Sequence, residues 1–429
     1  MAEALQDLRF DAAVVGGGLA GTVAAVAAAR RGISVLLVER HGFLGGNATA
    51  GAVGQFIGWS TLAGRRVIRG IAEEIVQRLQ ARGGGDGHHW FTMSTGHRID
   101  RVQYDPEVLK VVLDELAVGA GVTVLFHAAV AAVRRDGRSL TGLELLTKGG
   151  LMSVLPKVLV DASGELDALS LAGAEFLPLQ AGESLQPGTM MFRLGPIDFE
   201  TFDAVTTEER RALGERGVAE GRLTRAAVHC ARIPGTDDGW FNVTRVSLDA
   251  TDPMALSAAE IEGRRQALEA ARFIVETVPG CGAARLMQTA PQIGIRESRR
   301  IAGEHVLQAD ELRRGEVFAD TVCCGAYPID IHHAEGAALT LEAFAPDHYY
   351  RIPYRALVPR DFDNALVAGR GLSATHEALG AVRTMPTAMA IGEAAGAAAA
   401  LAVQSNAPMA RLDSERLRDG LRAAGAVVD

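Results

Sequence analysis

This chain of 429 residues has few cysteines and few aromatic side chains, and it has more acidic than basic residues. Its cysteines, Cys230, Cys281, Cys323 and Cys324, are too few and too badly spaced for a disulfide framework or a zinc site, and we expect no metal centre. The CxxxxC pair of disulfide reductases is absent. The neighbours Cys323 and Cys324 fit either a strained redox disulfide or two reduced structural thiols, and the usual state of intracellular thiols favours the second.

The charge balance also argues against nucleic-acid and membrane partners. The chain has 43 Lys and Arg against 52 Asp and Glu, a net charge of -9, which leaves no basic footprint for nucleic acid or membranes. No cationic segment precedes the first apolar run, so we expect no signal peptide. The alanine-rich run near the C-terminus is interrupted by Glu393 and by glycines and is too short to span a membrane. We expect a cytoplasmic protein with a small-molecule substrate, and self-association stays open.

The most informative stretch that is present runs from Gly16 to Gly21. It follows an apolar run, opens a segment of small residues, and is followed by a second apolar run that ends at Glu39. This order predicts a strand, a glycine turn, a helix and a second strand. Gly16 permits the tight turn, Gly18 lets the backbone approach a pyrophosphate, and Gly21 lets the helix pack closely. Glu39 then accepts hydrogen bonds from a ribose. The alternative is an ordinary glycine-rich turn with Glu39 an exposed acid.

A second glycine-rich block lies near the C-terminus. A strand predicted over 365–368 runs into Gly369 and Arg370. This block resembles the second flavin motif of FAD-dependent oxidoreductases, which implies that the turn lies close to the pyrophosphate and ribityl chain. Pro386 suits the first turn of a helix that continues from Thr387. The N-terminus of this helix would face the edge of a flavin ring that becomes negative on reduction. The alternative is a buried, closely packed helix without a cofactor. The two interpretations do not exclude each other, because a helix beside a flavin can also be buried and closely packed.

Four segments carry a wider resemblance: residues 45–51, 294–300, 327–332 and 364–396. Together they resemble the FAD-dependent oxidoreductase family, a two-dinucleotide-binding-domain flavoprotein class near the succinate dehydrogenase and fumarate reductase flavoproteins. The similarity covers about residues 10 to 425. It implies one non-covalent FAD per chain, and it does not specify a substrate. The resemblance and the fingerprint predict cofactor contacts from Gly16, Gly18, Leu19, Ala20, Gly21, Glu39, Arg40, Gly46, Asn47, Ala48, Thr49, Val130, Ala162, Gly164, Gly369, Arg370, Met385, Thr387 and Ala388.

The predicted fold is α/β, with a Rossmann-type parallel-sheet FAD-binding domain and an inserted, largely antiparallel α+β substrate domain. The FAD-binding domain takes residues 8–170 and 346–429, the substrate domain takes 171–345, and 59–99 are assigned partly to the substrate side. The sheet is expected from strands near 10–40, 122–126, 158–162 and 364–368.

The pattern of apolar residues and turn signals places further elements. Helices are predicted over 65–82, 106–120 and 257–276, the last with a capping box of Ser257 and Glu260. A hairpin turn is predicted at 136–137, and 83–90 is predicted to be a loop, with 87–91 either a lid or plain surface.

The candidate catalytic residues are His332 and His376. In a strand over 327–332, alternation places Tyr327 on one side and Asp330 with His332 on the other. Either histidine suits proton transfer near neutral pH. The alternatives are that His332 merely pairs with Asp330 and that His376 packs against Glu377.

The candidate substrate-binding residues are Arg296, Tyr327 and Arg383. An arginine suits a carboxylate or a reduced flavin because its planar fork of donors binds oxyanions in pairs. The alternatives are a salt bridge from Arg383 to Glu377 and a solvated helix face for Arg296.

These features predict an FAD-dependent dehydrogenase or oxidase. It would take a hydride from a small polar, anionic organic substrate to flavin N5. A flavin-dependent monooxygenase is the first alternative, although its usual C-terminal Gly-Asp is Gly369-Arg370 here. A non-catalytic flavin-binding protein is the second.

Overall fold

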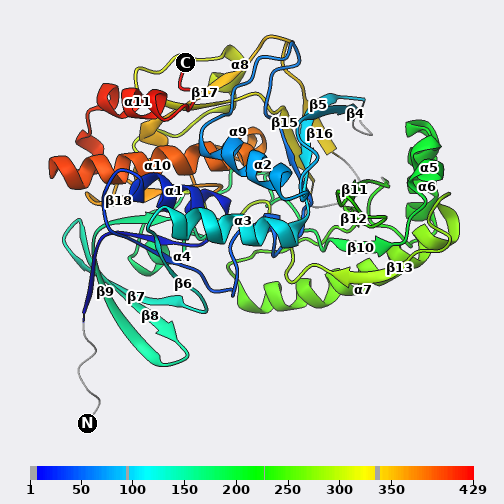
Figure 1. Ribbon diagram of the computed structural model, residues 1–429, viewed down its shortest axis with the longest axis horizontal. Coiled ribbons are helices and arrows are strands. Elements are labelled where there is room, and N and C mark those ends of the chain that lie inside the picture. The colour runs from blue at the N-terminus through cyan, green and yellow to red at the C-terminus, as the bar shows by residue number, and fades with distance from the viewer. Residues whose placement is uncertain (1–6, 93–95, 227, 334–338) are drawn as a thin grey trace.

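A computed structural model describes residues 7–92, 96–226, 228–333 and 339–429 of the chain (Figure 1). A seven-stranded mixed sheet forms its centre, with strand order β6-β2-β1-β9-β8-β7 and β18 beside β9. The strands are β1 (Leu8–Val15), β2 (Val35–Val38), β6 (Thr123–Leu125), β7 (Ala129–Asp136), β8 (Ser139–Thr147), β9 (Gly150–Asp161) and β18 (Ala365–Val367).

The parallel part of the sheet joins segments that are far apart in the sequence. β1 lies between β2 and β9, β2 pairs with β6, and β9 pairs with β18, all in parallel. β7 and β8 form an antiparallel hairpin that turns after Asp136. The Rossmann-type sheet is therefore confirmed, including the return of the C-terminal segment to it. Continuous apolar runs suit these strands because helices cover a parallel sheet on its faces.

Two small-residue helices pack against each other over this sheet, α1 (Leu19–Ala29) and α10 (Met385–Ser405). A Cβ atom added at Gly392 would collide with the carbonyl oxygen of Ala20, and one added at Gly396 would collide with that of Ala24. The alanine and glycine run of α10 is thus required by close helix packing. Among the described residues, α10 alone is long and apolar enough to cross a membrane, but 83% of its apolar window is buried, as in a core helix.

The apolar side chains that α1 and α10 bury against the central sheet form what we call the first core. Other helices pack around the sheet. They are α2 (Ile71–Ala81), α3 (Pro106–Gly119), α4 (Asp167–Leu171), α8 (Ala309–Arg314), α9 (His376–Val382) and α11 (Ser414–Ala423). The helix predicted over 65–82 begins only at Ile71, because Gly70 before it has a left-handed φ of 67°. The carboxylate of Glu393 accepts the Ile71 N–H at 3.0 Å and so caps α2 from α10.

A second core lies to the right in Figure 1 and is built on an antiparallel sheet. Its strand order is β11-β12-β10-β13. The elements are β10 (Phe192–Gly195), β11 (Cys230–Arg232), β12 (Gly239–Phe241), β13 (Arg285–Thr289), α5 (Phe199–Ala204), α6 (Thr207–Ala219) and α7 (Pro253–Thr277). The predicted capping box of α7 is wrong: Asp252 caps the helix five residues earlier, and Ser257 donates to the Pro253 carbonyl.

Three small antiparallel sheets complete the fold. They are β3 (Gln55–Ile57) with β5 (Arg98–Gln103) and β4 (His89–Thr92), β14 (Thr321–Gly325) with β17 (Tyr350–Pro353), and β15 (Ile329–His332) with β16 (Leu339–Glu342). Short 3-10 turns cover Gly46–Ala48, Tyr354–Leu357 and Met409–Arg411.

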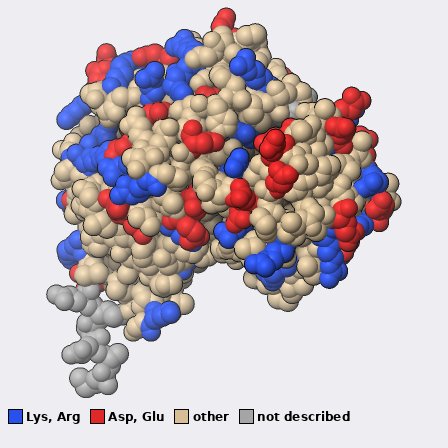
Figure 2. Space-filling view, turned by 45° about the vertical axis from the view of Figure 1, so that its right-hand side comes forward, with Lys and Arg blue, Asp and Glu red and all other residues tan. Residues whose placement is uncertain are grey.

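The structure of these segments corrects the prediction for residues 87–91 and bears on the predicted domain boundaries. The loop or lid expected around 87–91 is in part the edge strand β4. The second core gathers side chains from Met190 to Ile295 with Ala52, whereas side chains between 307 and 358 pack in the first core. The domain boundaries at 170 and 345 stay predictions. Figure 2 shows acidic and basic side chains interspersed over one face of the molecule.

Candidate flavin and substrate site

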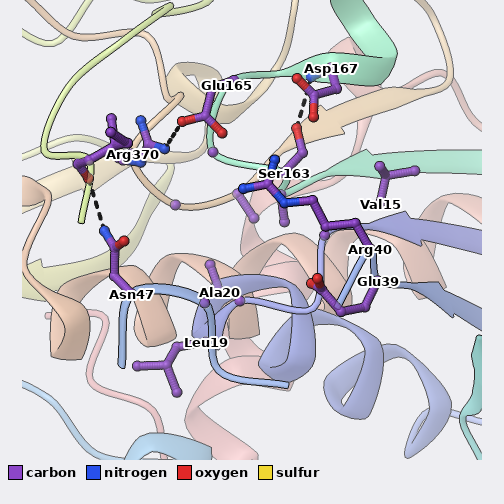
Figure 3. Close-up of a pocket in the computed structure, with 18 of the residues that line it drawn as sticks. Val15, Leu19, Ala20, Glu39, Arg40, Asn47, Ser163, Glu165, Asp167 and Arg370 are labelled. Atoms are coloured by element: carbon purple, nitrogen blue, oxygen red, sulfur yellow. Dashed lines mark hydrogen bonds and ion pairs between the residues drawn. The ribbon is translucent and has the colours of Figure 1, made fainter. Parts of the chain in front are cut away.

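A cavity of about 480 Å³ opens where the parallel strands of the central sheet end (Figure 3). We call it the cofactor cavity. It contains most of the predicted cofactor residues, from both glycine-rich blocks: Gly16, Gly18, Leu19, Ala20, Glu39, Arg40, Gly46, Asn47, Val130, Ala162, Gly164, Gly369, Arg370, Met385 and Ala388. Segments more than 300 residues apart thus meet at one edge of the sheet, where ligands of such folds bind.

The glycine turn keeps the entrance to α1 open. Gly16 has a φ of 95°, and a Cβ there would press on Ser163, so only glycine fits. A Cβ at Gly18 would meet only Gly46, at 3.9 Å, so its cavity side is open space. Gly18 also begins α1 without a side-chain cap. The free N–H groups of this helix end therefore suit a pyrophosphate.

Glu39 follows β2 and is nearly buried at the cavity wall. Its carboxylate accepts the backbone N–H groups of Gly17 and His41, both at 2.7 Å. An ionised carboxylate offers about four lone-pair positions, so two of them stay available for ribose hydroxyls. The position and geometry fit the ribose contact that the sequence predicts.

The loop at 45–47 lies against the glycine turn. Gly45 donates its N–H to the carbonyl of Gly17 at 2.8 Å, and the Asn47 side chain donates to the carbonyl of Ile295 at 2.9 Å. Across the cavity, α10 begins after Thr384 without a side-chain cap, and Met385 and Ala388 of its first turn line the cavity. A second helix N-terminus therefore faces the cavity, with the partial positive charge that a reduced flavin favours. These features together fit FAD.

Four of the predicted cofactor residues lie behind the cavity wall rather than in it: Gly21, Ala48, Thr49 and Thr387. A Cβ at Gly21 would collide with the Gly16 carbonyl oxygen, so this glycine serves helix packing, as its place in the fingerprint predicts. Thr387 is fully buried and lies 3.1 Å from the Thr384 hydroxyl.

The other two support the 45–49 loop from inside. The Thr49 hydroxyl donates to the Leu44 carbonyl at 2.7 Å, and the Ala48 carbonyl accepts the Tyr104 hydroxyl at 3.1 Å. Motif membership alone does not separate such supporting residues from those that face the cavity.

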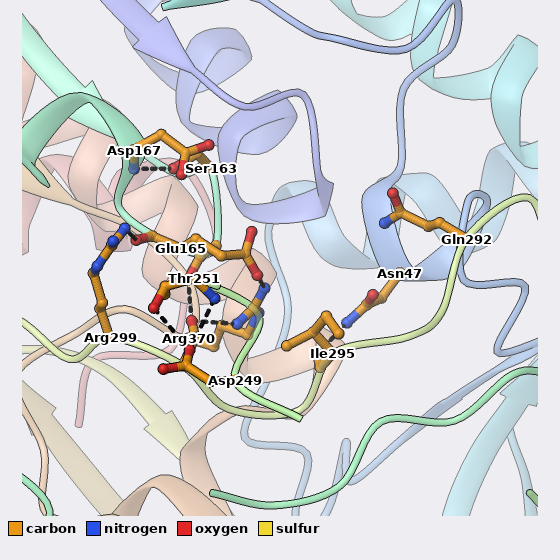
Figure 4. A network of polar contacts seen from close by, with 12 residues as sticks. Asn47, Ser163, Glu165, Asp167, Asp249, Thr251, Gln292, Ile295, Arg299 and Arg370 are labelled. Carbon is orange, nitrogen blue, oxygen red and sulfur yellow. Dashed lines mark hydrogen bonds and ion pairs between the residues drawn. The ribbon is translucent and has the colours of Figure 1, made fainter. Parts of the chain in front are cut away.

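A polar network that sequence reasoning missed forms another wall (Figure 4). Arg370 forms an ion pair with Glu165 and donates to the Ser298 hydroxyl at 2.9 Å, while Arg299 donates to the Glu165 carbonyl at 3.1 Å. Burial, and then the nearby Glu165 and Asp161 charges, raise the pKa of Asp167 to about 6. The strand and turn before these acids were recognisable, but no local pattern marked the acids.

A smaller cavity of about 180 Å³ adjoins the first and shares Asn47, Ile295, Arg370, Arg383 and Met385 with it. We call it the arginine pocket. Its lining includes the predicted residues Arg296, Tyr327, His332 and Arg383. Asp330 is the one acidic residue among the described residues of the lining, against four arginines there: Arg225, Arg296, Arg370 and Arg383.

Asp330 is the polar centre of this pocket. Its Oδ2 atom accepts the Tyr327 hydroxyl at 3.0 Å and lies 3.5 Å from both His332 Nε2 and Arg383. The prediction that Tyr327 points away from Asp330 is wrong, because β15 begins only at Ile329, after Pro328, and alternation does not extend back to Tyr327. The predicted pairing of His332 with Asp330 is present.

Burial and the excess of cations set the ionisation of these groups. Burial opposes the charge of Asp330, but His332 and Arg383 outweigh it and hold the pKa of Asp330 below its ordinary value. Burial and then Arg296 lower the pKa of His332 against the pull of Asp330, so its imidazole is neutral. Burial, Arg383 and Arg225 lower the pKa of Arg296 to about 9. The pocket is thus short of negative charge.

His376 lies outside both cavities, so the prediction that it lines the pocket is wrong. It is the first residue of α9, and its Nδ1 lies 2.8 Å from the buried carboxylate of Glu297. The alternative partner, Glu377, instead pairs with Arg313. That ion pair also removes the alternative in which Glu377 holds Arg383.

Sequence reasoning missed Arg225. It lies between α6 and β11 in a stretch without helix or strand, is half-buried, and donates to the Asn242 carbonyl at 3.4 Å. Nothing in its local sequence distinguishes it from a surface arginine. Only the packing of this stretch beside β12 brings its charge to the pocket.

The sheet, the uncapped helix ends and the cofactor cavity define a Rossmann-type flavoprotein. More particularly, the chain belongs to the FAD-dependent oxidoreductase family, whose sequence profile matches residues 11–421. Its cofactor is therefore FAD. No curated protein sequence matches the chain.

Solved structures share the fold at low sequence identity. A geranylgeranyl bacteriochlorophyll reductase-like protein from Thermoplasma acidophilum is 12% identical, with a TM-score of 0.50 over 96% of this chain and 90% of that chain. The p-nitrophenol 4-monooxygenase PnpA from Pseudomonas putida DLL-E4 is 12% identical, with a TM-score of 0.51 over 98% of this chain and 89% of that chain. At such identities the likeness shows the fold alone.

Proposed function

We propose that this protein oxidises a small anionic organic substrate by hydride transfer to FAD. The observation that supports this most is the arginine pocket, which shares a wall of five residues with the cofactor cavity. FAD supplies the hydride acceptor at N5, and the chain supplies binding, orientation and proton transfer.

The arginines orient the substrate. Arg383 lines both cavities, its Nε is buried without a hydrogen-bond partner, and its NH2 contacts Asp330. One N–H group of Arg296 donates a hydrogen bond to the Pro187 carbonyl at 2.6 Å. Because buried charges are costly unless paired, a carboxylate placed between these guanidiniums satisfies donors that the protein leaves open.

His332 is the group best placed to take a proton. Its imidazole is neutral, which a base requires, but the surrounding cations make it a weak base in the empty pocket. An anionic substrate offsets those cations and so raises the pKa of His332. Binding of the correct substrate therefore strengthens the base that its own oxidation needs.

Anaerobic bleaching of the flavin absorbance tests the proposal. The purified holoprotein is mixed with hydroxy acids, amino acids, and the uncharged alcohols and amides that correspond to them. We expect bleaching by one or more carboxylate-bearing donors and none by uncharged analogues of the same donors. Bleaching by the uncharged analogues alone would contradict the proposal.

A flavin-dependent monooxygenase is the second candidate, favoured by the fold shared with p-nitrophenol 4-monooxygenase. It predicts that the organic substrate leaves the flavin oxidised, that a nicotinamide nucleotide reduces it, and that oxygen then enters the product. A protein whose flavin no donor reduces would instead be a non-catalytic flavin-binding protein. A cytoplasmic location, a small-molecule partner and the lack of nucleic-acid or membrane partners stay predictions from the sequence.

A further inference from the structure

A third cavity, of about 240 Å³, adjoins the arginine pocket on the side away from the cofactor. We call it the outer cavity. Phe91 and His229 line both the outer cavity and the arginine pocket, so the two meet at this pair of side chains. The outer cavity lies between the small sheet that holds β4 and β5 and the helices α5 and α6 of the second core.

The outer cavity is cationic. Four arginines line it, Arg101, Arg210, Arg211 and Arg232, and Asp203 is the one acid among the described residues of its lining. Three of the guanidiniums lie over phenylalanine rings, at 4.3 to 4.4 Å from the ring centres: Arg101 over Phe91, Arg210 over Phe202 and Arg232 over Phe199. A guanidinium that stacks on a ring keeps its edge of N–H donors for an oxyanion.

The protein neutralises these charges only weakly. Arg210 lies 3.7 Å from Asp203 and donates to the Phe202 carbonyl at 2.7 Å, and its Nε is buried without a hydrogen-bond partner. Arg232 lies 3.9 Å from an exposed Asp237 and donates its Nε–H to the Thr236 carbonyl at 3.3 Å. The two distances to aspartate are too long for good charge-assisted hydrogen bonds, which are near 2.7–2.9 Å. An anion in the outer cavity therefore meets donors that are still available.

The boundary with the arginine pocket is polar and uncharged. His229 Nε2 lies 2.9 Å from the Gln55 side-chain nitrogen, and the Gln55 oxygen is buried without a partner. Burial and then Arg101, Arg225 and Arg210 lower the pKa of His229 to about 3, so it stays neutral between cations on both sides. The positive potential thus continues from the outer cavity into the arginine pocket.

We infer that the outer cavity is the way by which small anions reach the flavin, with Phe91 and the His229–Gln55 pair at the inner opening. A cleft lined by one sign of charge raises the local concentration of the opposite ion and its rate of arrival. That the natural anion is the substrate rests on the proposed function; the path itself does not.

Dithionite serves as the probe because it is a small anion that reduces flavins without using the substrate site chemistry. Two electrons pass from dithionite, which is oxidised to two sulfite ions, to FAD, which is reduced. The control reductant is the methyl viologen radical cation. The loss of flavin absorbance is followed by anaerobic stopped flow on the holoprotein at low and high salt.

The double variant Arg210→Gln/Arg232→Gln should be reduced by dithionite about tenfold more slowly at low salt, with the difference shrinking at high salt. Reduction by methyl viologen should not slow. The variant Arg210→Lys/Arg232→Lys keeps both charges and should recover most of the dithionite rate. The matched control Arg135→Gln/Arg314→Gln removes two exposed charges that line none of the three cavities and should behave as wild type.

The inference is overturned if the Gln variant reacts with dithionite at the wild-type rate, or if the Lys variant is as slow as the Gln variant. Equal slowing by both reductants would also overturn it, because a packing defect acts on either. No hydride-donating substrate enters this experiment. A failure to find a hydride donor therefore counts against the proposed function and leaves the result on the path unchanged.

Discussion

The cofactor cavity and the arginine pocket share a wall, yet they are built in different ways. The cofactor cavity is shaped by main chain and small residues, such as Gly16, Gly18 and Gly369, at the ends of parallel strands. The arginine pocket is shaped by long side chains, such as Arg225 and Arg296, that arrive from unrelated segments. The first cavity is open to a ligand because glycine leaves its backbone uncovered, and the second has an excess of positive charge.

This difference teaches which part of the protein is general and which is particular. A backbone cradle at a helix N-terminus fits any dinucleotide of the right length, so it identifies FAD and no substrate. A set of buried guanidiniums with one carboxylate requires a matching anion, because unpaired buried charge is costly. Substrate choice should therefore lie with the arginines, and four predictions follow from the contrast.

The largest effect is expected from Arg383→Met in the arginine pocket. Removing the guanidinium takes away the cation that Asp330 contacts and one donor for the substrate anion, which should weaken substrate binding by about 2–5 kcal/mol. FAD content should stay at one per chain, although Arg383 also borders the cofactor cavity. Titration of the flavin spectrum with a donor found by anaerobic screening measures the affinity. Loss of FAD with unchanged substrate affinity would contradict the prediction, because Arg383 would then serve the cofactor and not the substrate.

A large effect on stability is expected from substituting Glu393, a residue of α10 that lines neither the cofactor cavity nor the arginine pocket. Burial raises the pKa of Glu393 from 4.5 to about 7. The folded protein then holds this proton more tightly than the unfolded chain. The resulting contribution to the free energy of unfolding is therefore fully present below pH 4.5 and is lost as the pH rises toward about 7. The loss amounts to about 3 kcal/mol.

Glu393→Gln should remove this part of the pH dependence, because the amide does not ionise. Denaturant unfolding of wild type and variant at several pH values between 4.5 and 7.5 measures it. Parallel curves for the two proteins across that range would show that Glu393 titrates normally. The exposed Glu415→Gln is a suitable control.

The third prediction separates the two histidines. His332→Ala should slow flavin reduction by the donor about a hundredfold or more while FAD stays bound, as expected for a positioned base. His376→Ala should slow it much less, because His376 contacts Glu297 and lines neither cavity. Stopped-flow measurement of the reductive half-reaction compares them. Equal slowing by both variants would place the proton path through His376 instead.

The smallest effect is expected in the cofactor cavity, from Glu39→Ala. It removes the acceptor for the ribose and for the Gly17 N–H, and should weaken FAD binding by about 1.5–3 kcal/mol. FAD release on dilution, followed by flavin fluorescence, measures the affinity, and acid precipitation should free the flavin from wild type. Glu39→Gln keeps one acceptor oxygen and should lose less. Colour that stays in the acid pellet would contradict non-covalent binding.

Prediction from the sequence succeeded where a segment carries its own structural reason. The glycine turn before α1, the strand β18 and the hairpin at Asp136 each follow from local residues. It failed at the start of α7, where a second local signal was overlooked: Asp252 caps the helix and Pro253 is its first residue, so the predicted Ser257 cap lies inside the helix. Likewise, Tyr327 lies before the start of β15, so strand alternation does not apply to it and its hydroxyl contacts Asp330.

The sequence by itself determined that this chain folds around a Rossmann-type sheet and uses FAD, and it predicted that the cofactor lies between the two glycine-rich blocks. Glycine conformation, strand patterning and helix ends are local properties, and they act wherever the residues occur. Only the tertiary structure decided that Arg225, Arg296 and Arg383 enclose one pocket and that His376 stays outside it. The charge of a side chain becomes a binding site only when burial removes water and other segments supply its neighbours, and no single segment contains that information.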